Sequence, residues 1–459
     1  MSANDSNPKQ TKRAPKEERP FKPGLRARQA AAKMLAAVID RRTSLDGLLD
    51  SEHGNPAYRE LNDADRALVR AIVNSALRQL PRIEAMLGLL LQNPLPEGAR
   101  ALHHVLVTAA TQILFLDVPD HSAVDLAVEQ ANIDPRNRRF ASLVNAVLRR
   151  LSREKTELLG HAAEAIPAMP KWFYERLVAA YGENQARLIA DAQLEPAAID
   201  LSVKSDRDKW AAAFSGLVLP TGSVRLPAFT GSIPGLDGFA EGEWWVQDAA
   251  ASIPARLFGD LTGKSVVDLC AAPGGKTAQL VLAGGTVTAL DQSASRLKRL
   301  RSNLERLGLS AETHETNMED FKPDRRFDAV LLDAPCSSTG TTRRHPDVLW
   351  TKGPQDIEKL AGLQVRLLRH ALNLVETGGT LVFSNCSLDP REGEMVVAKV
   401  LGERTDFERV EIDPRDWPGL EDAINDKGEF RTTPAMLPTP EGFASGLDGF
   451  YAAVLRKNR

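Results

Sequence analysis

The sequence predicts an all-α domain followed by a doubly wound α/β domain, with a small subdomain between them. Apolar residues recur at helical spacing from about residue 26 to residue 153, as in the run from Phe140 to Leu151. From Gly263 onward, short apolar strands alternate with helices, which is typical of a mostly parallel sheet covered by helices. A chain of 459 residues is also too long for one ordinary domain.

The N-terminal end is basic, although the whole chain has a net charge of −3. Residues 1–30 contain eight Lys or Arg residues and three acidic residues, and Pro and polar residues leave little apolar surface to bury. This composition predicts a disordered tail over residues 1–25. The tail is either a solubilising leader or a segment that attracts RNA without sequence preference.

Three further segments follow the tail. Residues 26–158 are predicted to form a compact domain of six or seven helices. Residues 159–245, where Pro and Gly accumulate, are predicted to be a connector with a small subdomain. Residues 246–459 are predicted to form the α/β domain, with strands at 264–270, 286–291, 328–333, 380–384 and 449–456, and helices from 276, at 293–307, at 354–375 and from 392.

Composition excludes several classes of protein. No run of about 18 apolar residues predicts a membrane span, and no apolar signal core stands at the N-terminus. Three cysteines are too few for a disulfide framework in a chain of this size. We therefore expect a cytoplasmic protein with free thiols. The motifs predict no metal site, and we expect a monomer.

The strongest local motif is a turn of small residues between a predicted strand and a predicted helix, Cys270-Ala271-Ala272-Pro273-Gly274-Gly275-Lys276. Small side chains let a ligand approach the backbone, and a helix N-terminus offers free N–H groups to an anion. Asp291 ends the next predicted strand, where an acid accepts hydrogen bonds from ribose hydroxyls. The motif therefore predicts a nucleoside-containing ligand at this edge of the sheet.

Three ligands compete for this loop. A Walker A loop for ATP needs Gly where this chain has Cys270, and a dinucleotide loop needs G-x-G-x-x-G, which is absent here. S-adenosylmethionine needs a tight glycine turn and a ribose acid but no phosphate cradle. The sequence therefore favours S-adenosylmethionine.

Two cysteines follow two other predicted strands. Cys336 lies in Asp333-Ala334-Pro335-Cys336, and Cys386 lies in Ser384-Asn385-Cys386. A single crossover helix separates the two strands, so we expect them to be neighbours and their thiols to reach one pocket. An isolated cysteine is more often a small buried hydrophobe, which is how we interpret Cys270.

Paired thiols beside a methyl donor suit alkylation of a pyrimidine at C5. A low-pKa cysteine adds to C6 and makes C5 nucleophilic, and a base later removes the C5 proton. Asp333 is predicted to bind the exocyclic amine or protonated N3 and so to select cytosine. Arg343 and Arg344 are candidates for phosphate contact, with a solvated loop as the alternative. His345 is either a base or a structural residue.

Three stretches, DLCAAPGGKT, DAPCSSTGTTRRHPDVLW and SNCSLDPREGE, resemble the Nop2/Sun family of RNA cytosine-5 methyltransferases. The helical region, especially FASLVNAVLR at 140–149, resembles the NusB-like RNA-binding domain. The combination is similar to the bacterial Sun/Fmu type, which methylates a cytosine of small-subunit (16S) ribosomal RNA. The resemblance implies a Rossmann-like catalytic domain and covers nearly the whole chain after the first 25 or so residues.

The resemblance also implies roles for single residues. Cys386 is the implied nucleophile, and Cys336 is implied to assist release of the methylated RNA. S-adenosylmethionine is implied to be held by Cys270–Lys276, Asp291 and Asp333. Family members often carry an acid where this chain has Asn317, whose amide can still bind the adenosine region, and Thr where it has Asn385.

Other functions fit parts of this pattern. The chain could be a NusB-like RNA-binding or transcription factor with a vestigial methyltransferase domain, but Cys336, Cys386, Asp291 and Asp333 are all intact. It could instead methylate uridine or another RNA such as tRNA. The two cysteines could also exchange roles, because a Pro-Cys motif holds the nucleophile in DNA cytosine methyltransferases.

Overall fold

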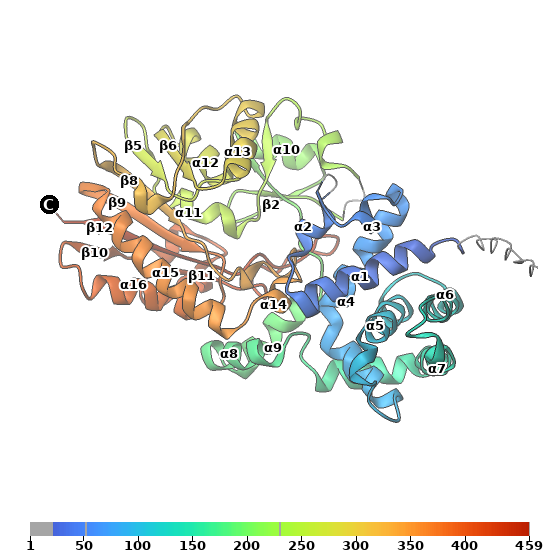
Figure 1. The fold of residues 1–459 in the computed structure, drawn as a ribbon. Helices are drawn as coiled ribbons and strands as arrows, with labels where there is room; N and C mark the ends of the chain where they lie inside the picture. The colour runs from blue at the N-terminus through green and yellow to red at the C-terminus, as the bar shows by residue number, and fades with distance from the viewer. Residues whose placement is uncertain (1–21, 51–52, 229–230, 459) are drawn as a thin grey trace, which may run out of the picture.

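The computed structural model describes residues 22–50, 53–228 and 231–458. Figure 1 shows a helical half, in blue and teal, beside a half built on a sheet, in yellow to red, with a smaller green subdomain next to both. The predicted order of an α domain followed by an α/β domain is confirmed. Within the described residues no helix is both long enough and apolar enough to cross a membrane. The predicted basic tail falls mostly outside them.

The helical domain is a bundle around one core of Ala, Leu, Val and Ile side chains. The last helix continues to Ala165, past the predicted end at 158, because Leu158, Leu159 and Ala162 keep its apolar face against that core. The helices are α1 (Leu25–Arg41), α2 (Leu45–Leu49), α3 (Pro56–Arg59), α4 (Asp63–Leu90), α5 (Arg100–Phe115), α6 (Asp120–Ile133) and α7 (Ala141–Ala165).

The connector contains two helices, α8 (Lys171–Tyr181) and α9 (Glu183–Ala192), and then a small antiparallel sheet with one helix, α10 (Arg207–Ala213). The sheet has the strand order β2-β3-β1-β4. Sequence analysis predicted a subdomain here but not its strands, because they are two to four residues long. They are β1 (Asp200–Val203), β2 (Leu217–Val218), β3 (Val224–Arg225) and β4 (Trp244–Val246).

The C-terminal half contains an eight-stranded sheet with the path β10-β12-β9-β8-β5-β6-β7, and β11 pairs with β12. Strands β5 to β9 are parallel, and β12 joins antiparallel to β9. The carboxyl ends of β5, β6, β8 and β9 therefore meet at one edge. The strands are β5 (Ser265–Asp268), β6 (Thr286–Asp291), β7 (Glu312–Glu315), β8 (Phe327–Asp333), β9 (Val375–Asn385), β10 (Phe407–Val410), β11 (Phe430–Thr432) and β12 (Phe450–Lys457).

Helices cover both faces of this sheet, as predicted for a doubly wound fold (Figure 1). Sequence analysis did not predict β7, which reads Glu-Thr-His-Glu and is an edge strand without fully buried residues. The helices are α11 (Ile253–Arg256), α12 (Gly275–Leu282), α13 (Ala294–Arg306), α14 (Val348–Thr351), α15 (Pro354–Asn373) and α16 (Glu394–Leu401).

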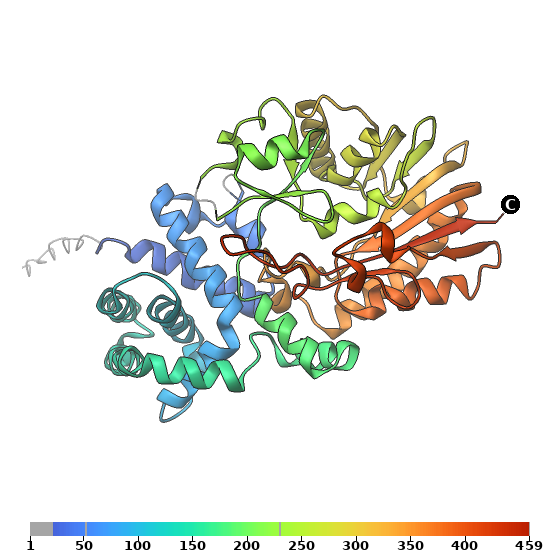
Figure 2. The same cartoon turned by 180° about the vertical axis from the view of Figure 1, so that it is seen from behind.

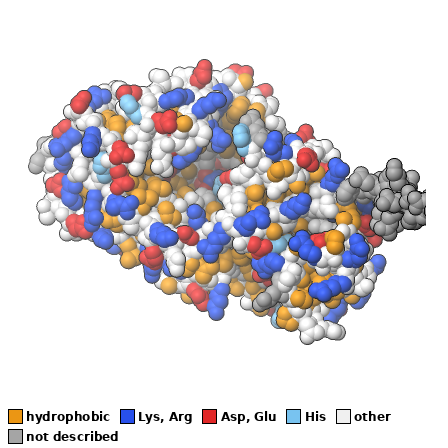
Figure 3. All heavy atoms as spheres, viewed as in Figure 1, with side chains coloured by type: hydrophobic (Ala, Val, Ile, Leu, Met, Phe, Trp, Pro, Cys, Tyr) orange, Lys and Arg blue, Asp and Glu red, His pale blue; other side chains and the backbone are white. Residues whose placement is uncertain are grey.

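The segment between β11 and β12 leaves the sheet and extends toward the helical half (Figure 2). It contacts the other parts of the chain through its backbone: Arg225 donates to the carbonyl of Ala444, and Arg343 donates to the carbonyl of Ser445. The space-filling view shows a hollow near the middle of the face seen in Figure 1, with Lys and Arg side chains spread around it (Figure 3).

Candidate active site

The predicted cofactor loop joins the end of β5 to the start of α12. Gly274 precedes the helix with φ of 103°, and a Cβ there would lie 3.1 Å from a side-chain carbon of Leu300. No side chain caps this helix, so its first N–H groups are available to a ligand. Ala271 and Ala272 are buried beside the turn. A larger residue at Gly274 would be strained, which explains the glycine in local terms.

Two buried carboxylates near the loop, those of Asp268 and Asp291, each have one oxygen atom that accepts no hydrogen bond. Asp291, at the end of β6, accepts from the backbone N–H of Ser293 through Oδ1, while Oδ2 accepts no hydrogen bond and has Arg296 at 3.2 Å. Asp268, at the end of β5, accepts from Thr277 through Oδ2, and its Oδ1 is unpaired. Burial raises the pKa of Asp268 to about 7. The Asp291 oxygen that accepts no hydrogen bond suits a ribose hydroxyl donor, even with Arg296 nearby.

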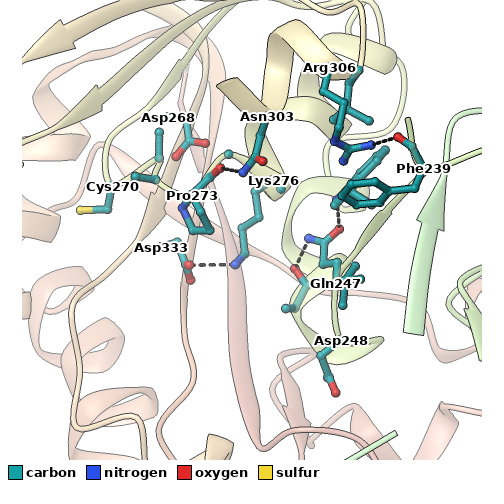
Figure 4. A pocket seen from close by; sticks show the side chains of 18 residues that line it. Phe239, Gln247, Asp248, Asp268, Cys270, Pro273, Lys276, Asn303, Arg306 and Asp333 are labelled. Carbon is teal, nitrogen blue, oxygen red and sulfur yellow. Dashed lines mark hydrogen bonds and ion pairs between the residues drawn. The ribbon is translucent and has the colours of Figure 1, made fainter. Parts of the chain in front are cut away.

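Two cavities meet at the cofactor loop. One has a volume of about 340 Å³ and is lined by Trp245, Gln247, Asn303, Arg306 and the loop itself (Figure 4). The other has a volume of about 280 Å³, and its lining includes the predicted site residues Asp291, Asn317, Cys336 and Cys386. Cys270, Ala272 and Asp333 line both cavities. The strand ends thus bring the predicted cofactor residues and both predicted reactive cysteines to one place.

Lys276 and Asp333 form an ion pair between the two cavities. Lys276 Nζ lies 2.8 Å from Asp333 Oδ2, and the two side chains point toward one another in Figure 4. The hydroxyl of Ser384 donates to the other oxygen of Asp333 at 2.8 Å. Burial alone would lower the pKa of Lys276, but the Asp333 carboxylate outweighs this effect and the pKa lies above its usual value. Lys276 is therefore a fixed positive charge beside the thiols.

The two predicted reactive thiols face one another, with Cys336 Sγ 3.5 Å from Cys386 Sγ. Their strands, β8 and β9, are parallel neighbours, as predicted. The hydrogen bond from Cys336 lowers the pKa of Cys386, and Lys276 lowers it further against the opposing effects of burial and Asp333. The same hydrogen bond, together with burial, raises the pKa of Cys336 well above its usual value. Of the two, Cys386 is the thiol that ionises first.

The other predicted cofactor residues differ in their surroundings. Asn317, which follows β7, is exposed and lines the second cavity, and its Oδ1 accepts from the N–H of Glu319 at 3.3 Å. Burial raises the pKa of Cys270, so this third thiol stays protonated, in agreement with its interpretation as an unreactive residue of the turn.

The predicted phosphate contacts of the Arg343–His345 segment are not what the structure shows. The guanidinium of Arg343 is buried and donates to the carbonyls of Pro196 and Ser445. Arg344 forms ion pairs with Asp248 and Asp448, and His345 lies 3.3 Å from Asp46 of the helical domain. In this structure the buried guanidinium of Arg343 is out of reach of a phosphate, so a phosphate contact by Arg343 stays a prediction that requires this loop to open. A proton-accepting role for His345 has no support from its position beside Asp46.

Sequence analysis also missed a residue that supports the loop. Gln247 is buried; it donates to the carbonyl of Ala251 and to Gln279 of α12, and it accepts from Trp245 and Ser202. These bonds hold the small subdomain against the first turns of α12. No motif surrounds Gln247, and it stands at the predicted domain boundary, so nothing in the sequence singled it out. Among the described residues, no cluster of His, Cys, Asp or Glu side chains is arranged to hold a metal ion.

Comparisons with known proteins identify the family of this chain. The family model for 16S rRNA methyltransferase RsmB/F matches residues 260–456, and the NusB family model matches residues 25–153. The chain is 34% identical to ribosomal RNA small subunit methyltransferase B of Vibrio vulnificus, over 94% of this chain and 100% of the relative. It is 33% identical to the protein of the same name from Klebsiella pneumoniae, over 96% and 100%. The solved protein PH0851 shares the fold, with a TM-score of 0.71, 20% identity, and coverage of 94% of this chain and 99% of that one.

These matches cover both predicted domains in the predicted order, so the resemblance read from the three motifs and from the helical region is confirmed. The chain belongs to the RsmB/F family of 16S rRNA methyltransferases, with an N-terminal NusB domain.

Proposed function

We propose that this protein transfers a methyl group from S-adenosylmethionine to C5 of a cytosine in RNA, most specifically in 16S ribosomal RNA. The observation that carries the proposal is the pair of thiols 3.5 Å apart, one with a lowered and one with a raised pKa, in the cavity that also contains Asp291. Attack on the base needs only one cysteine. A second thiol is useful to an enzyme that must also break the bond between its nucleophile and the methylated base. Members of the family and the named relatives act on ribosomal RNA.

S-adenosylmethionine fits the residues at the loop. The oxygen of Asp291 that accepts no hydrogen bond would accept one from a ribose hydroxyl, and Asn317 would contact the adenosine region. The uncapped N-terminus of α12 and Lys276 would favour the carboxylate of the methionine end. When bound, the cofactor supplies the electrophilic methyl group of the reaction.

Cys386 begins the reaction as a thiolate, and its sulfur forms a bond to C6 of the cytosine. The electron pair of the C5–C6 double bond forms a C4–C5 double bond, and the C4–N3 pair moves to N3, which takes up a proton. C5 of this enamine is nucleophilic enough to take the methyl group, and the C4–N3 double bond re-forms as it does so. A base then removes the proton from C5, the C5–C6 double bond re-forms, the Cys386–C6 bond breaks with its electron pair on sulfur, and N3 gives up its proton. Cys336, which stays protonated beside Cys386, is placed to return a proton to the departing thiolate.

Asp333 and Lys276 give this pocket its preference for cytosine. Asp333 is a carboxylate held by Ser384 and Lys276 at the mouth of both cavities, where it would accept a hydrogen bond from the exocyclic amine or protonated N3. Uracil has a carbonyl in place of that amine and would face the carboxylate with an acceptor. The target base must leave its stack to reach the thiols.

The parts of the chain divide the work in this proposal. Residues 26–158 bind RNA, residues 159–245 connect and support the cofactor loop, and residues 246–459 carry the chemistry. The basic tail over residues 1–25 adds RNA affinity through its charge. We propose a cytoplasmic monomer without a metal.

The test is to incubate the purified protein with labelled S-adenosylmethionine and unmodified 16S ribosomal RNA, and to identify the methylated nucleoside by mass spectrometry. Cys386→Ala runs in parallel, with Cys270→Ala as the control that removes a thiol outside the proposed chemistry. We expect 5-methylcytidine from the wild type and from Cys270→Ala, and none from Cys386→Ala. Label in 5-methyluridine would show that the substrate base is uridine and not cytosine. Label in transfer RNA alone would change the substrate, and no label in any RNA or in ribosomal particles would favour an RNA-binding protein with a vestigial catalytic domain.

A further inference from the structure

A buried carboxylate lies behind the two thiols and contacts both of the loops that carry them. Glu392 follows β9 in a short 3-10 turn, and its side chain is inaccessible to solvent. It does not line the cavity that contains Cys336 and Cys386, so it has no contact with a substrate. We propose that Glu392 is a positioning residue that fixes the distance between the two cysteine loops.

The contacts of Glu392 reach the residue after each cysteine. Its Oε1 accepts from the backbone N–H of Ser337 at 2.8 Å, and its Oε2 accepts from the hydroxyls of Ser337 and Ser387, the latter at 2.7 Å. Ser337 directly follows Cys336, and Ser387 directly follows Cys386. The backbone carbonyl of Glu392 also accepts from the side-chain amide of Asn385, the residue before Cys386. Glu392 is therefore bonded to the residue that follows Cys336 and to the residues on both sides of Cys386.

The number of donors explains why the residue is an acid. Ser337 N–H, the Ser337 hydroxyl, the Ser387 hydroxyl and the amide of Gln364 all point at the two carboxylate oxygens. A carboxylate accepts several hydrogen bonds and donates none, so it matches this arrangement. Burial favours the neutral acid and raises the pKa of Glu392, while the bonds from Ser337 and Ser387 oppose this effect.

The loops have other connections. The hydroxyls of Ser337 and Ser387 lie 3.2 Å apart, and the hydroxyl of Thr339 lies 3.3 Å from each of them. The N–H of Gly340 donates to the carbonyl of Cys386, and the N–H of Leu388 donates to Thr339. Glu392 differs from these groups because its carboxylate only accepts, so that the donors of both loops can be directed at it at the same time. Without Glu392, the two hydroxyls and the N–H of Ser337 would lose their shared acceptor in a buried site. The loops would then separate or sample several positions, and the thiols would no longer be held at contact distance.

This inference rests on the proposed two-cysteine reaction for its functional meaning, but the distance it concerns can be measured without RNA or cofactor. Diamide takes two electrons and two protons from a thiol pair, which becomes a disulfide while the diazene becomes a hydrazine. The rate of the Cys336–Cys386 disulfide, followed by mass spectrometry of peptides, reports how often the two sulfurs meet. The same variants are then assayed for kcat and KM of methyl transfer.

Glu392→Ala is expected to slow disulfide formation about 10-fold and to lower kcat about 100-fold with KM within about twofold, because misplacing a reacting group by about 1 Å costs that much. Glu392→Gln is expected to restore most of both rates. Its amide oxygen can take the position of Oε1, and its NH₂ can donate to the two serine hydroxyls, which accept as well as donate. Glu403→Ala, which removes an exposed partner of Arg369 near the end of α16, is the control and is expected to behave as wild type.

Wild-type disulfide rates in a folded Glu392→Ala protein, or rates above them, would overturn the proposal. If Glu392→Ala does not fold, Ser387→Ala decides the matter, because it removes a hydroxyl donor to Glu392, together with the acceptor of the Asp389 N–H, and no charge. It is expected to slow disulfide formation about threefold, since the bond to Glu392 contributes about 0.5–1.5 kcal/mol, and a wild-type rate there would overturn the proposal. If the protein makes no 5-methylcytidine but its disulfide rate depends on Glu392, only the proposed function is contradicted. If it makes 5-methylcytidine but its disulfide rate does not depend on Glu392, only this inference is contradicted.

Discussion

The indole Nε1 of Trp350 donates a 3.0 Å hydrogen bond to the backbone carbonyl of Leu77, which joins the loop after Cys336 to the core of the helical domain. The ring packs against that core. Two further bonds lie nearby: Arg78 donates to the carbonyl of Arg343, and the backbone N–H of Leu45 donates to Asp347 at 2.9 Å. The NusB domain therefore holds one of the two cysteine-bearing segments, so its docking and the geometry of the catalytic site are physically linked.

Trp350→Phe tests this link with a small change. The ring still fills most of the space, but the hydrogen bond to Leu77 is lost, so we expect the free energy of unfolding to fall by about 1 kcal/mol. Trp350→Ala also leaves a cavity, and we expect a loss of about 3–5 kcal/mol. Chemical denaturation monitored by circular dichroism measures both. If the domains dock through this loop, Trp350→Ala will also unfold in two separated transitions.

Trp417→Phe is the matched control. Trp417 packs on Phe430 and belongs to a core cluster of the catalytic half, away from the helical domain. It is expected to lower stability without separating the transitions. A single cooperative transition in Trp350→Ala, with methyl transfer at the wild-type rate, would show that docking does not depend on this contact.

Cys336→Ala is expected to trap the enzyme on its RNA. Cys386 loses the hydrogen bond that lowers its pKa but keeps the favourable charge of Lys276, so it can still form the bond to C6. No neighbouring thiol then returns a proton when that bond must break. Turnover should fall while a protein–RNA adduct accumulates, which denaturing gel electrophoresis with labelled RNA detects. The double variant with Cys386→Ala should form no adduct. If Cys336→Ala forms no adduct, Cys336 is the nucleophile and the proposed roles of the two cysteines are reversed.

Lys276→Met is expected to shift the pH dependence of the reaction. The positive charge of Lys276 lowers the pKa of Cys386, so its removal raises that pKa and reduces the fraction of thiolate at a given pH. The acidic limb of the kcat/KM profile should therefore move to higher pH, and the rate lost at pH 7 should be partly recovered at pH 9. Lys276→Arg, which keeps the charge, should leave the limb near its wild-type position. A uniform loss of rate at every pH would assign Lys276 to binding rather than to the ionisation of Cys386.

The sequence predicted the site best where a residue type has few structural roles at its position. Glycines and alanines at the end of a buried strand predicted the loop at 270–276, and two cysteines after two strands predicted a shared pocket, because parallel neighbours end at the same edge. Short polar strands such as β7 lacked an apolar pattern. Glu392 lies inside the stretch SNCSLDPREGE, but its bond to Ser337 spans 55 residues, so the motif alone did not reveal this contact. The bond between Gln247 and Gln279 spans 32 residues, and no motif marks Gln247.

Arg343 shows the opposite case, in which a charge pattern suggested one partner and the structure shows others. Two arginines beside a reactive loop suggested phosphate contact, but burial lowers the pKa of Arg343, and its guanidinium donates to carbonyls of the connector and of the segment before β12. Arg343→Met is therefore expected to lower the free energy of unfolding by about 2–3 kcal/mol, because carbonyl acceptors of a charged donor are left unpaired.

RNA binding separates the two interpretations of Arg343. If its role is structural, folded Arg343→Met protein should bind 16S RNA with the same slope of log affinity against log salt concentration as the wild type. A phosphate contact would instead reduce the slope by about 0.7–0.9, the share of one released counterion. Fluorescence anisotropy at several salt concentrations, at a temperature where the variant is folded, measures this slope. Arg225→Met is a suitable control, since Arg225 is also buried and bonds to Asp200 and to the carbonyl of Ala444. Equal slopes in all three proteins would place both arginines in the support of the fold, whereas a smaller slope in Arg343→Met alone would mean that RNA binding opens the loop and exposes its guanidinium.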